Sequence, residues 1–308
     1  MKHVLAILVI LSIIIAAVMI AVYISYRELS IEQTSSSFST TPTHISKNQN
    51  TETHISVTEK TAGNIASVNG SGNVTIIVVV DNDPDPSGRL ESSWGLSILV
   101  ETGTEKILFD TGPSPSILQH NLRTIGVSPE EIDAVVISHL HGDHTSGLLY
   151  ILENNPGIPV YLPGPDARCI LSEIKSYGGR PILVNSMVEV ARGIYVLKPL
   201  YGPPWEEALV IMSDKGPVLL VGCSHPGIVR LVEEEINFTG KPPILVIGGF
   251  HLIGCSFSEC ERIANRLVSF GVGLIAPIHC SGDIIKHILS QEYPEHYLYA
   301  HTGSTIRI

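Results

Sequence analysis

The sequence lacks the motifs that assign a function most directly. Its 308 residues include no P-loop, no dinucleotide-binding fingerprint and no serine nucleophile elbow. Positive charge is also scarce: 19 Lys and Arg residues stand against 30 Asp and Glu residues, giving a formal net charge of −11. We therefore expect no nucleic-acid partner, because such partners are held by basic surfaces. A small anionic substrate stays compatible with this charge if a metal ion supplies local positive charge.

Cysteine is too rare for a secreted disulfide framework. The odd number, five, leaves at least one cysteine unpaired within a monomer. Cys255 and Cys260 can form a bridge if the domain lies outside the cytoplasm, but their spacing alone does not decide this. The other three are Cys169, Cys223 and Cys280.

The N-terminal 24 residues form a separate apolar segment. Residues 4–24 carry no charge and are long enough, at about 1.5 Å per residue, to cross a hydrocarbon core of about 30 Å. We expect residues 1–24 to be a membrane anchor with a single transmembrane helix. A cleaved signal peptide is the alternative, although its apolar region is normally shorter. A buried core helix is disfavoured because no face is polar.

The following segment, residues 25–73, is rich in Ser, Thr, Asn and Gln and shows almost no sustained periodicity. Such a segment cannot offset its ordering entropy, so we expect a disordered tether. The catalytic domain then occupies residues 74–308. The charges flanking the span and the Ser/Thr-rich tether favour an extracytoplasmic position for this domain.

The most informative motif is His-x-His-x-Asp-His at residues 139–144, directly after the apolar run of residues 134–137. Four ligand-type side chains from one turn at the end of a buried strand would repel or require desolvation unless a cation lay among them. Imidazole nitrogens with one carboxylate suit zinc, iron or manganese. A polar loop with chance histidines is the weaker interpretation. We expect Zn²⁺, as two ions, with Fe or Mn as alternatives.

Further motifs accompany this one. An Asp-x-Gly element closes residues 107–112, and glycine- or histidine-containing segments occupy residues 94–97, 222–228, 248–252 and 279–282. With the histidine motif, these segments resemble the metallo-β-lactamase superfamily, in particular its dihydropterin-ribofuranosylaminobenzene-phosphate synthase-like branch. The resemblance covers roughly residues 74–308. It implies an αββα sandwich, whereas periodicity alone supports only an α/β fold.

The hydrophobic pattern predicts two successive series of strands and helices. Residues 128–131 are typical of a helix start, with a Ser cap, Pro first and Glu three residues after the cap. Helices are also expected over residues 227–237 and 258–270. Strands are expected over residues 74–80, 96–101, 106–110, 134–138, 208–212, 218–221, 244–247 and 274–276.

Three later histidines, His225, His251 and His279, each follow an apolar strand. A structural role stays open for each, and most of all for His251. By the superfamily resemblance, one metal would be held by His139, His141 and His225, and the second by Asp143, His144 and His279.

The resemblance departs from the usual pattern at Cys223, where other members place a bridging aspartate. Cys223 can be a thiolate ligand or a small buried hydrophobe, and both interpretations stay open here. We expect Asp110 to orient a metal-binding side chain by hydrogen-bonding to it, without contacting the metal itself. Asp143 and His251 are the candidate catalytic residues, Asp143 to hold the nucleophile and His251 to act as an acid or electrophile.

Three functions fit these expectations. The first is a membrane-tethered hydrolase that uses a metal-bound hydroxide on a small-molecule ester, lactone or phosphoester. The second is a pterin-type cofactor synthase or transferase of the same fold, against which a membrane anchor argues because such a pathway would be cytoplasmic. The third is a metal-binding protein without turnover, which would show no catalytic dependence on Asp143.

Overall fold

The computed structural model describes residues 73–308. Its first strand begins at Thr75. The predicted anchor, residues 1–24, and nearly all of the predicted tether, residues 25–73, lie outside the described residues, so these two assignments stay predictions. Within residues 73–308, no helix has both the length and the apolar character needed to cross a bilayer.

Two β-sheets form the centre of the domain. The seven-stranded sheet has the order β15-β1-β2-β3-β4-β5-β6, and the six-stranded sheet has the order β14-β13-β12-β11-β8-β7. Strands β3 to β6 run parallel, as do β12 to β14, whereas the other pairs are antiparallel. The strands are β1 (Thr75–Val80), β2 (Ser97–Glu101), β3 (Lys106–Phe109), β4 (Ala134–Val136), β5 (Pro159–Pro163), β6 (Arg180–Val184), β7 (Val188–Ala191), β8 (Ile194–Val196), β11 (Leu209–Ser213), β12 (Gly216–Val221), β13 (Leu245–Gly249), β14 (Leu274–Ile278) and β15 (Thr305–Arg307), with β9 (Leu200–Tyr201) and β10 (Trp205–Glu206) as a separate pair.

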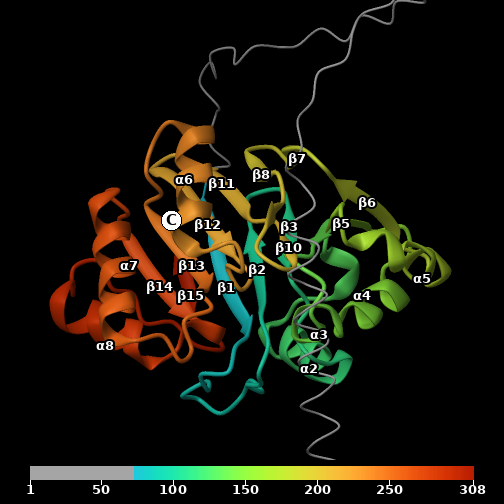
Figure 1. Ribbon diagram of the computed structural model, residues 1–308. Helices are drawn as coiled ribbons and strands as arrows, with labels where there is room; N and C mark the ends of the chain where they lie inside the picture. Colours follow the sequence, from blue (N-terminus) through green and yellow to red (C-terminus); the bar gives the residue numbers. More distant parts are fainter. Residues whose placement is uncertain (1–72) are drawn as a thin grey trace, which may run out of the picture. The chain divides into compact units, whose positions relative to one another are not determined.

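Helices cover the outer face of each sheet (Figure 1). On one side lie α2 (Pro115–Ile125), α3 (Gly142–Thr145), α4 (Leu148–Asn154) and α5 (Leu171–Ser176). On the other side lie α6 (Ile228–Thr239), α7 (Phe257–Ser269) and α8 (Asp283–Glu292). The result is the four-layer αββα arrangement.

Three buried apolar clusters correspond to the three contacts between these layers. The central cluster joins inward-facing residues of both sheets, including Phe109 and Leu220. A second cluster packs α6, α7 and α8 on the six-stranded sheet, and the third packs α2, α4 and α5 on the seven-stranded sheet. Each sheet therefore buries both faces, which explains why strands such as β12 are continuous apolar runs rather than alternating patterns.

The predicted strands and the helices over residues 227–237 and 258–270 correspond to observed elements, with ends shifted by one or a few residues. The helix expected from Ser128 is only a three-residue 3-10 turn, Pro129–Glu131. Glu131 does accept the Ser128 N–H at 2.8 Å, as a capping box requires. The chain then enters β4 at Ala134 and pairs with β3, so the turn has no room to extend.

The fold brings the ends of strands from both sheets to one region. Strands β3 and β4 are parallel in one sheet, and β12, β13 and β14 are parallel in the other. The segments with the predicted site residues all follow these strands. Ligands in α/β folds characteristically bind beyond the carboxyl ends of parallel strands.

Candidate metal centre

The loop after β4 and the loop after β12 bring together His139, His141 and His225. The ring centroids lie 4.7 Å apart for His139 and His141, 4.7 Å for His139 and His225, and 4.9 Å for His141 and His225. One ligand atom from each falls within 4.8 Å of the other two, a spacing suited to one metal ion. His139 is fully buried while His141 is exposed, so this group opens toward solvent on the His141 side.

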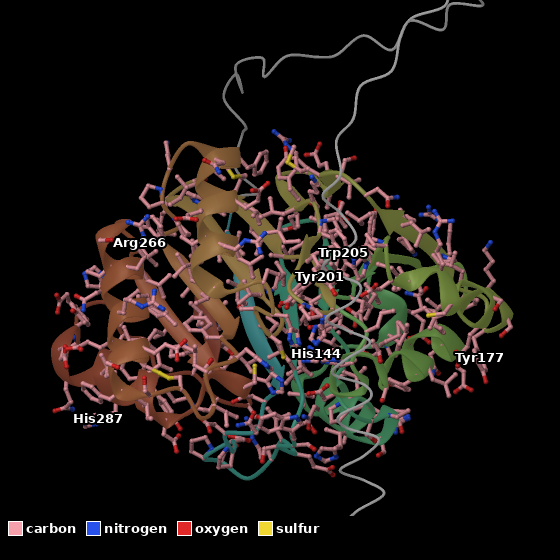
Figure 2. The ribbon with its side chains drawn as sticks, viewed as in Figure 1. His144, Tyr177, Tyr201, Trp205, Arg266 and His287 are labelled. Atoms are coloured by element: carbon pink, nitrogen blue, oxygen red, sulfur yellow. A yellow bond between two sulfur atoms is a disulfide. The ribbon has the colours of Figure 1, made fainter. Side chains whose placement is uncertain are left out.

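A second group forms beside the first from Asp143, His144 and His279. The Nε2 atoms of His144 and His279 lie 3.8 Å and 3.4 Å from Asp143 Oδ2. One ligand atom from each of the three falls within 4.8 Å of the others. The groups adjoin, because the ring centroids of His139 and His144 are 4.2 Å apart. Figure 2 shows His144 near the middle of the domain, between its two helical sides.

The buried ring nitrogens test whether this site suits a cation. Among the described residues, Nε2 of His225 and Nε2 of His279 are buried without a hydrogen-bond partner. Leaving a buried polar atom unpaired costs about 1–3 kcal/mol, and a cation in each group would remove that cost. Because one such atom belongs to each group, the residues present fit two metal ions.

The protonation states also suit metal binding. Burial, together with the neighbouring imidazoles His144 and His225, lowers the pKa of His139 well below its ordinary value. Burial and the neighbouring His251 and His141 lower the pKa of His225 to about 4. Both rings are therefore neutral at physiological pH, as metal ligands must be.

Asp143 completes the second group as an anion. Burial opposes its ionisation, but the rings of His279 and His144 lower the pKa of Asp143 well below its ordinary value. The centre thus combines imidazoles, of which those of His139 and His225 are neutral, with a charged carboxylate, the ligand mixture expected for zinc, iron or manganese.

Asp110 hydrogen-bonds to Ser138 and His144, at the two ends of the segment that carries the histidine motif. Its Oδ1 accepts the Ser138 N–H at 2.7 Å, and its Oδ2 lies 2.7 Å from both the Ser138 hydroxyl and His144 Nδ1. Burial disfavours the charged form of His144, but the Asp110 carboxylate outweighs it and raises the pKa of His144. This is a carboxylate–histidine pair that fixes which ring nitrogen faces the metal position.

Two further buried carboxylates, missed by the sequence analysis, hold the other ligand segments. Glu206 accepts backbone N–H groups from Cys223, Ser224 and His225 at 2.9, 2.8 and 2.7 Å. Burial raises the pKa of Glu206 to about 7, although these three donors oppose the rise. Asp81 accepts the His279 N–H at 2.7 Å. Each of the three ligand segments is therefore fixed by a buried acid.

Unusual backbone conformations are concentrated at the candidate metal centre. In residues 73–308, the non-glycine residues with positive φ are Asp110 (58°), Ser224 (59°), His251 (54°) and His279 (52°). All four belong to, or adjoin, the segments that form the site. Such conformations cost on the order of 1–3 kcal/mol each and concentrate at functional sites, where the surrounding structure enforces them.

His251 lies at the rim of the first group. Its ring centroid is 4.4 Å from that of His225, and its side chain is exposed. A hydrogen bond with Cys280 raises the pKa of His251, against the opposing effect of burial. His251 can therefore carry a proton at the open side of the centre.

Comparisons with known proteins agree with this geometry. The sequence profile of the metallo-β-lactamase superfamily matches residues 95–235. The chain is 26% identical to Tm1679, described as a metal-dependent hydrolase of the β-lactamase superfamily, with a TM-score of 0.64 over 76% of this chain and 99% of that chain. This chain contains a metallo-β-lactamase domain.

Two further relatives bear on this metallo-β-lactamase domain. A 7,8-dihydropterin-6-methyl-4-(β-D-ribofuranosyl)-aminobenzene-5′-phosphate synthase from Methanocaldococcus jannaschii is 28% identical, over 76% of this chain and 97% of the relative. The human tRNase Z short form shares the fold with a TM-score of 0.53 over 75% of this chain and 98% of that chain, at 16% identity. The family resemblance inferred from the motifs is thereby confirmed.

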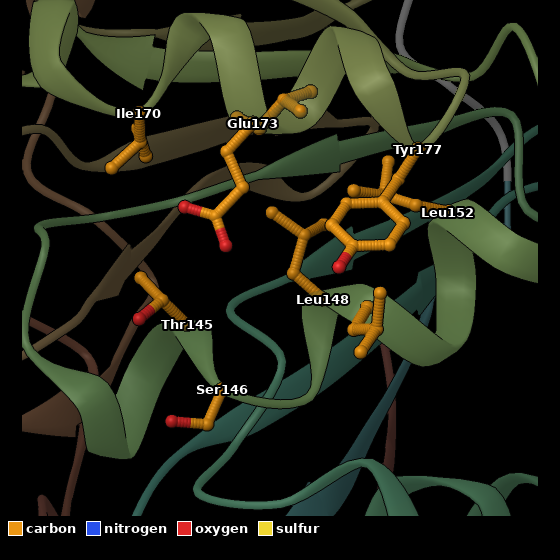
Figure 3. Close-up of a pocket in the computed structure, with 9 residues that line it drawn as sticks. Thr145, Ser146, Leu148, Leu152, Ile170, Glu173 and Tyr177 are labelled. Carbon is orange, nitrogen blue, oxygen red and sulfur yellow. The ribbon is translucent and has the colours of Figure 1, made fainter.

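Two cavities lie near the proposed metal-binding residues of the metallo-β-lactamase domain. One, of about 380 Å³, is lined by His279 itself with Asn82, Asp83 and Lys286. The other, of about 360 Å³, is lined by Thr145 and Ser146, which directly follow His144, and by Leu148, Glu173 and Tyr177 across it (Figure 3). The first touches a proposed metal ligand, so it is the better candidate for space that a substrate occupies during reaction.

Proposed function

We propose that the chain is a metal-dependent hydrolase acting on a small ester, lactone or phosphoester. The observation that carries this proposal is the pair of adjoining ligand groups, each with one buried, unpartnered imidazole nitrogen. His139, His141 and His225 would hold one ion, and Asp143, His144 and His279 the other, with Zn²⁺ as the expected metal and Fe or Mn as alternatives.

A bound divalent cation lowers the pKa of water from 15.7 to about 7 and polarises the bond under attack. The protein's own residues supply the rest. Asp143, held ionised by its neighbours, accepts a hydrogen bond from the attacking water and orients it. His251 reaches the open side of the centre with a raised pKa and donates a proton to the leaving group. Asp110 keeps His144 in one tautomer throughout.

The test is hydrolysis by the full-length protein after loading with zinc, iron or manganese in separate preparations. A carboxylic ester, a lactone, a phosphomonoester and a phosphodiester would be offered in parallel. Asp143→Asn should abolish turnover of whichever substrate is accepted. Asp214→Asn is a matched control, because Asp214 lies exposed in the turn between β11 and β12. No hydrolysis of any of these substrates by the metal-loaded wild type would contradict the proposal and leave a metal-binding protein without turnover. Equal hydrolysis rates for the wild type and Asp143→Asn would contradict the role assigned to Asp143.

A synthase is the second candidate, and the M. jannaschii relative is the specific observation in its favour. The aligned region covers nearly all of that relative, so the whole catalytic domain is comparable. Incubation with a pterin and a ribofuranosyl-aminobenzene phosphate, followed by mass spectrometry, separates the two functions. A condensed product without hydrolysis of any ester would favour the synthase.

We further propose that residues 1–24 tether the domain to a membrane and that the domain is extracytoplasmic. The uncharged run of residues 4–24 supports the tether. The Cys255–Cys260 disulfide supports an oxidising compartment. Cell fractionation of the full chain and of a chain lacking residues 1–72 tests the first point, since only the full chain should sediment with membranes. Protease treatment of intact cells tests the second.

A further inference from the structure

The connection between β13 and α7 carries both His251 and a disulfide. Cys255, in this connection, is joined to Cys260, in the first turn of α7. Cys260 is fully buried in the apolar cluster that packs α6, α7 and α8 on the six-stranded sheet, and the half-buried Cys255 packs against the same cluster. The disulfide therefore fastens a mostly exposed connection to the core of the domain.

The connection is attached to the domain near both of its ends. Near its start, the Phe250 N–H donates to the Ser281 hydroxyl at 3.0 Å. The Leu252 N–H donates to the Cys280 carbonyl at 3.1 Å. Residues 253 and 254 follow and are exposed, and the disulfide then ties the chain to α7. Breaking the disulfide removes this second attachment.

The same connection shapes the open side of the metal centre. His251 has a positive φ of 54°, a conformation that persists only where the surrounding structure enforces it. Its ring centroid lies 4.4 Å from that of His225. Ile253 and Gly254 line the cavity of about 380 Å³ that also touches His279. One short segment therefore sets both the position of the proposed proton donor and one wall of the candidate substrate cavity.

We propose that Cys255 and Cys260 are positioning residues, whose disulfide holds His251 at the metal centre and makes hydrolysis depend on the redox state of the protein. This inference rests on the proposed function, in which His251 donates a proton to the leaving group.

Reduction by a dithiol releases the segment. A thiolate of the reductant attacks the sulfur of Cys255, the more accessible partner, so that the S–S bond breaks and Cys260 leaves as a thiolate that takes up a proton. The second sulfur of the reductant then displaces Cys255, which also becomes a thiol, and the reductant ends as a disulfide. The two thiols are free to move apart, so His251 loses one of its two attachments.

The test compares leaving groups, because a proton donor contributes most where the leaving group is a strong base. The accepted substrate class would be offered in an aryl form, which expels a phenolate, and in an alkyl form, which expels an alkoxide. The Cys255→Ser, Cys260→Ser double variant of the full-length protein should lose kcat on the alkyl form by up to about 100-fold, the loss expected when a catalytic group moves by about 1 Å. Its kcat on the aryl form should stay close to that of the wild type. His251→Ala should show the same selectivity, and removing the disulfide from it should have no further effect.

Two controls separate positioning from general damage. Zinc content should be equal in the wild type and the double variant, and Cys169→Ser should match the wild type on both substrate forms, since Cys169 is free and exposed. Equal losses on the aryl and alkyl forms, or no loss on either, would overturn the proposal. If the double variant does not fold, wild type that has been reduced by a dithiol and then freed of it under anaerobic conditions takes its place, with the same expected results.

Thiol titration tests the disulfide itself. Wild type purified without reductant should show three thiols, those of Cys169, Cys223 and Cys280, and five after reduction. Denaturant is needed, because Cys223 and Cys280 are buried beside the proposed metal ligands. Five thiols before reduction would overturn the proposal. A wild type with three thiols and bound zinc that hydrolyses neither substrate form would instead refute the proposed function, and with it the dependence proposed here.

Discussion

Replacing Glu206 by glutamine tests the idea that buried acids fix the ligand segments. The carboxylate accepts three backbone N–H groups, from Cys223, Ser224 and His225. Glutamine is nearly isosteric but has one acceptor oxygen. It can keep the two bonds made by Oε1, whereas its amide nitrogen would then face the His225 N–H as a second donor. One charge-assisted hydrogen bond beside a proposed metal ligand is therefore lost.

The size of this loss decides which measurement to use. A hydrogen bond to a charged group contributes about 1.5–3 kcal/mol, which corresponds to about a 10- to 100-fold loss of metal affinity. Global stability is a poor readout, because burial raises the pKa of Glu206 to about 7 and glutamine removes that buried charge. The two effects on stability oppose each other and are of similar size. No opposing effect of this kind is expected for metal affinity, so metal affinity is the better measurement.

The assay is competition for zinc between the protein and a chromophoric chelator at pH 8. We expect Glu206→Gln to bind zinc about 10- to 100-fold more weakly than the wild type. Glu235→Gln is the matched control, because Glu235 is equally buried but lies in α6 and bonds only Thr239. Equal zinc affinity for Glu206→Gln and Glu235→Gln would refute the reasoning.

Three further predictions concern the ligands, a buried charge and a close backbone approach. The His139→Ala, His141→Ala double variant should lose the first metal, so that metal analysis finds about half the wild-type content; unchanged stoichiometry would remove the assignment. Burial raises the pKa of Glu235 to about 7, so between pH 4.5 and pH 7 the native state binds more protons than the unfolded state, and stability falls as pH rises. Glu235→Gln should abolish this fall of about 3 kcal/mol, measured by urea unfolding at pH 5 and pH 8; the same slope in both proteins would refute it. A Cβ on Gly222 would overlap the Ser138 hydroxyl and approach Glu206 Oε1, so Gly222→Ala should lower both the melting temperature and zinc affinity. Gly126→Ala is the control: the added Cβ meets no other atom there, so this variant should change stability and leave zinc affinity unchanged.

The sequence predicts the parts of this protein whose physical signal is local. Apolar runs such as residues 218–221 mark strands because a sheet covered on both faces buries every side chain. The motif at residues 139–144 indicates a candidate metal centre because its four ligand-type side chains lie within six residues. Helix α2 was not predicted, although its Pro at the first turn and Gly126 after its end are ordinary helix signals.

What the sequence does not predict depends on pairing between distant segments. Glu206 approaches the ligand segments because β11, which follows it, pairs with β12. Cys280 approaches them because β14, which precedes it, pairs with β13, which in turn pairs with β12. Asp81 carried a usable signal, since it directly follows the apolar strand β1 just as Asp110 follows β3. A carboxylate immediately after a buried strand needs a partner, and in both cases the partner is a ligand segment.

The most direct test of the central claim is anomalous X-ray diffraction from crystals of the zinc-loaded protein, measured on both sides of the zinc absorption edge. We predict two anomalous peaks, one among His139, His141 and His225 and one among Asp143, His144 and His279. Peaks elsewhere, or no peak in protein that has been supplied with excess zinc, would contradict the account.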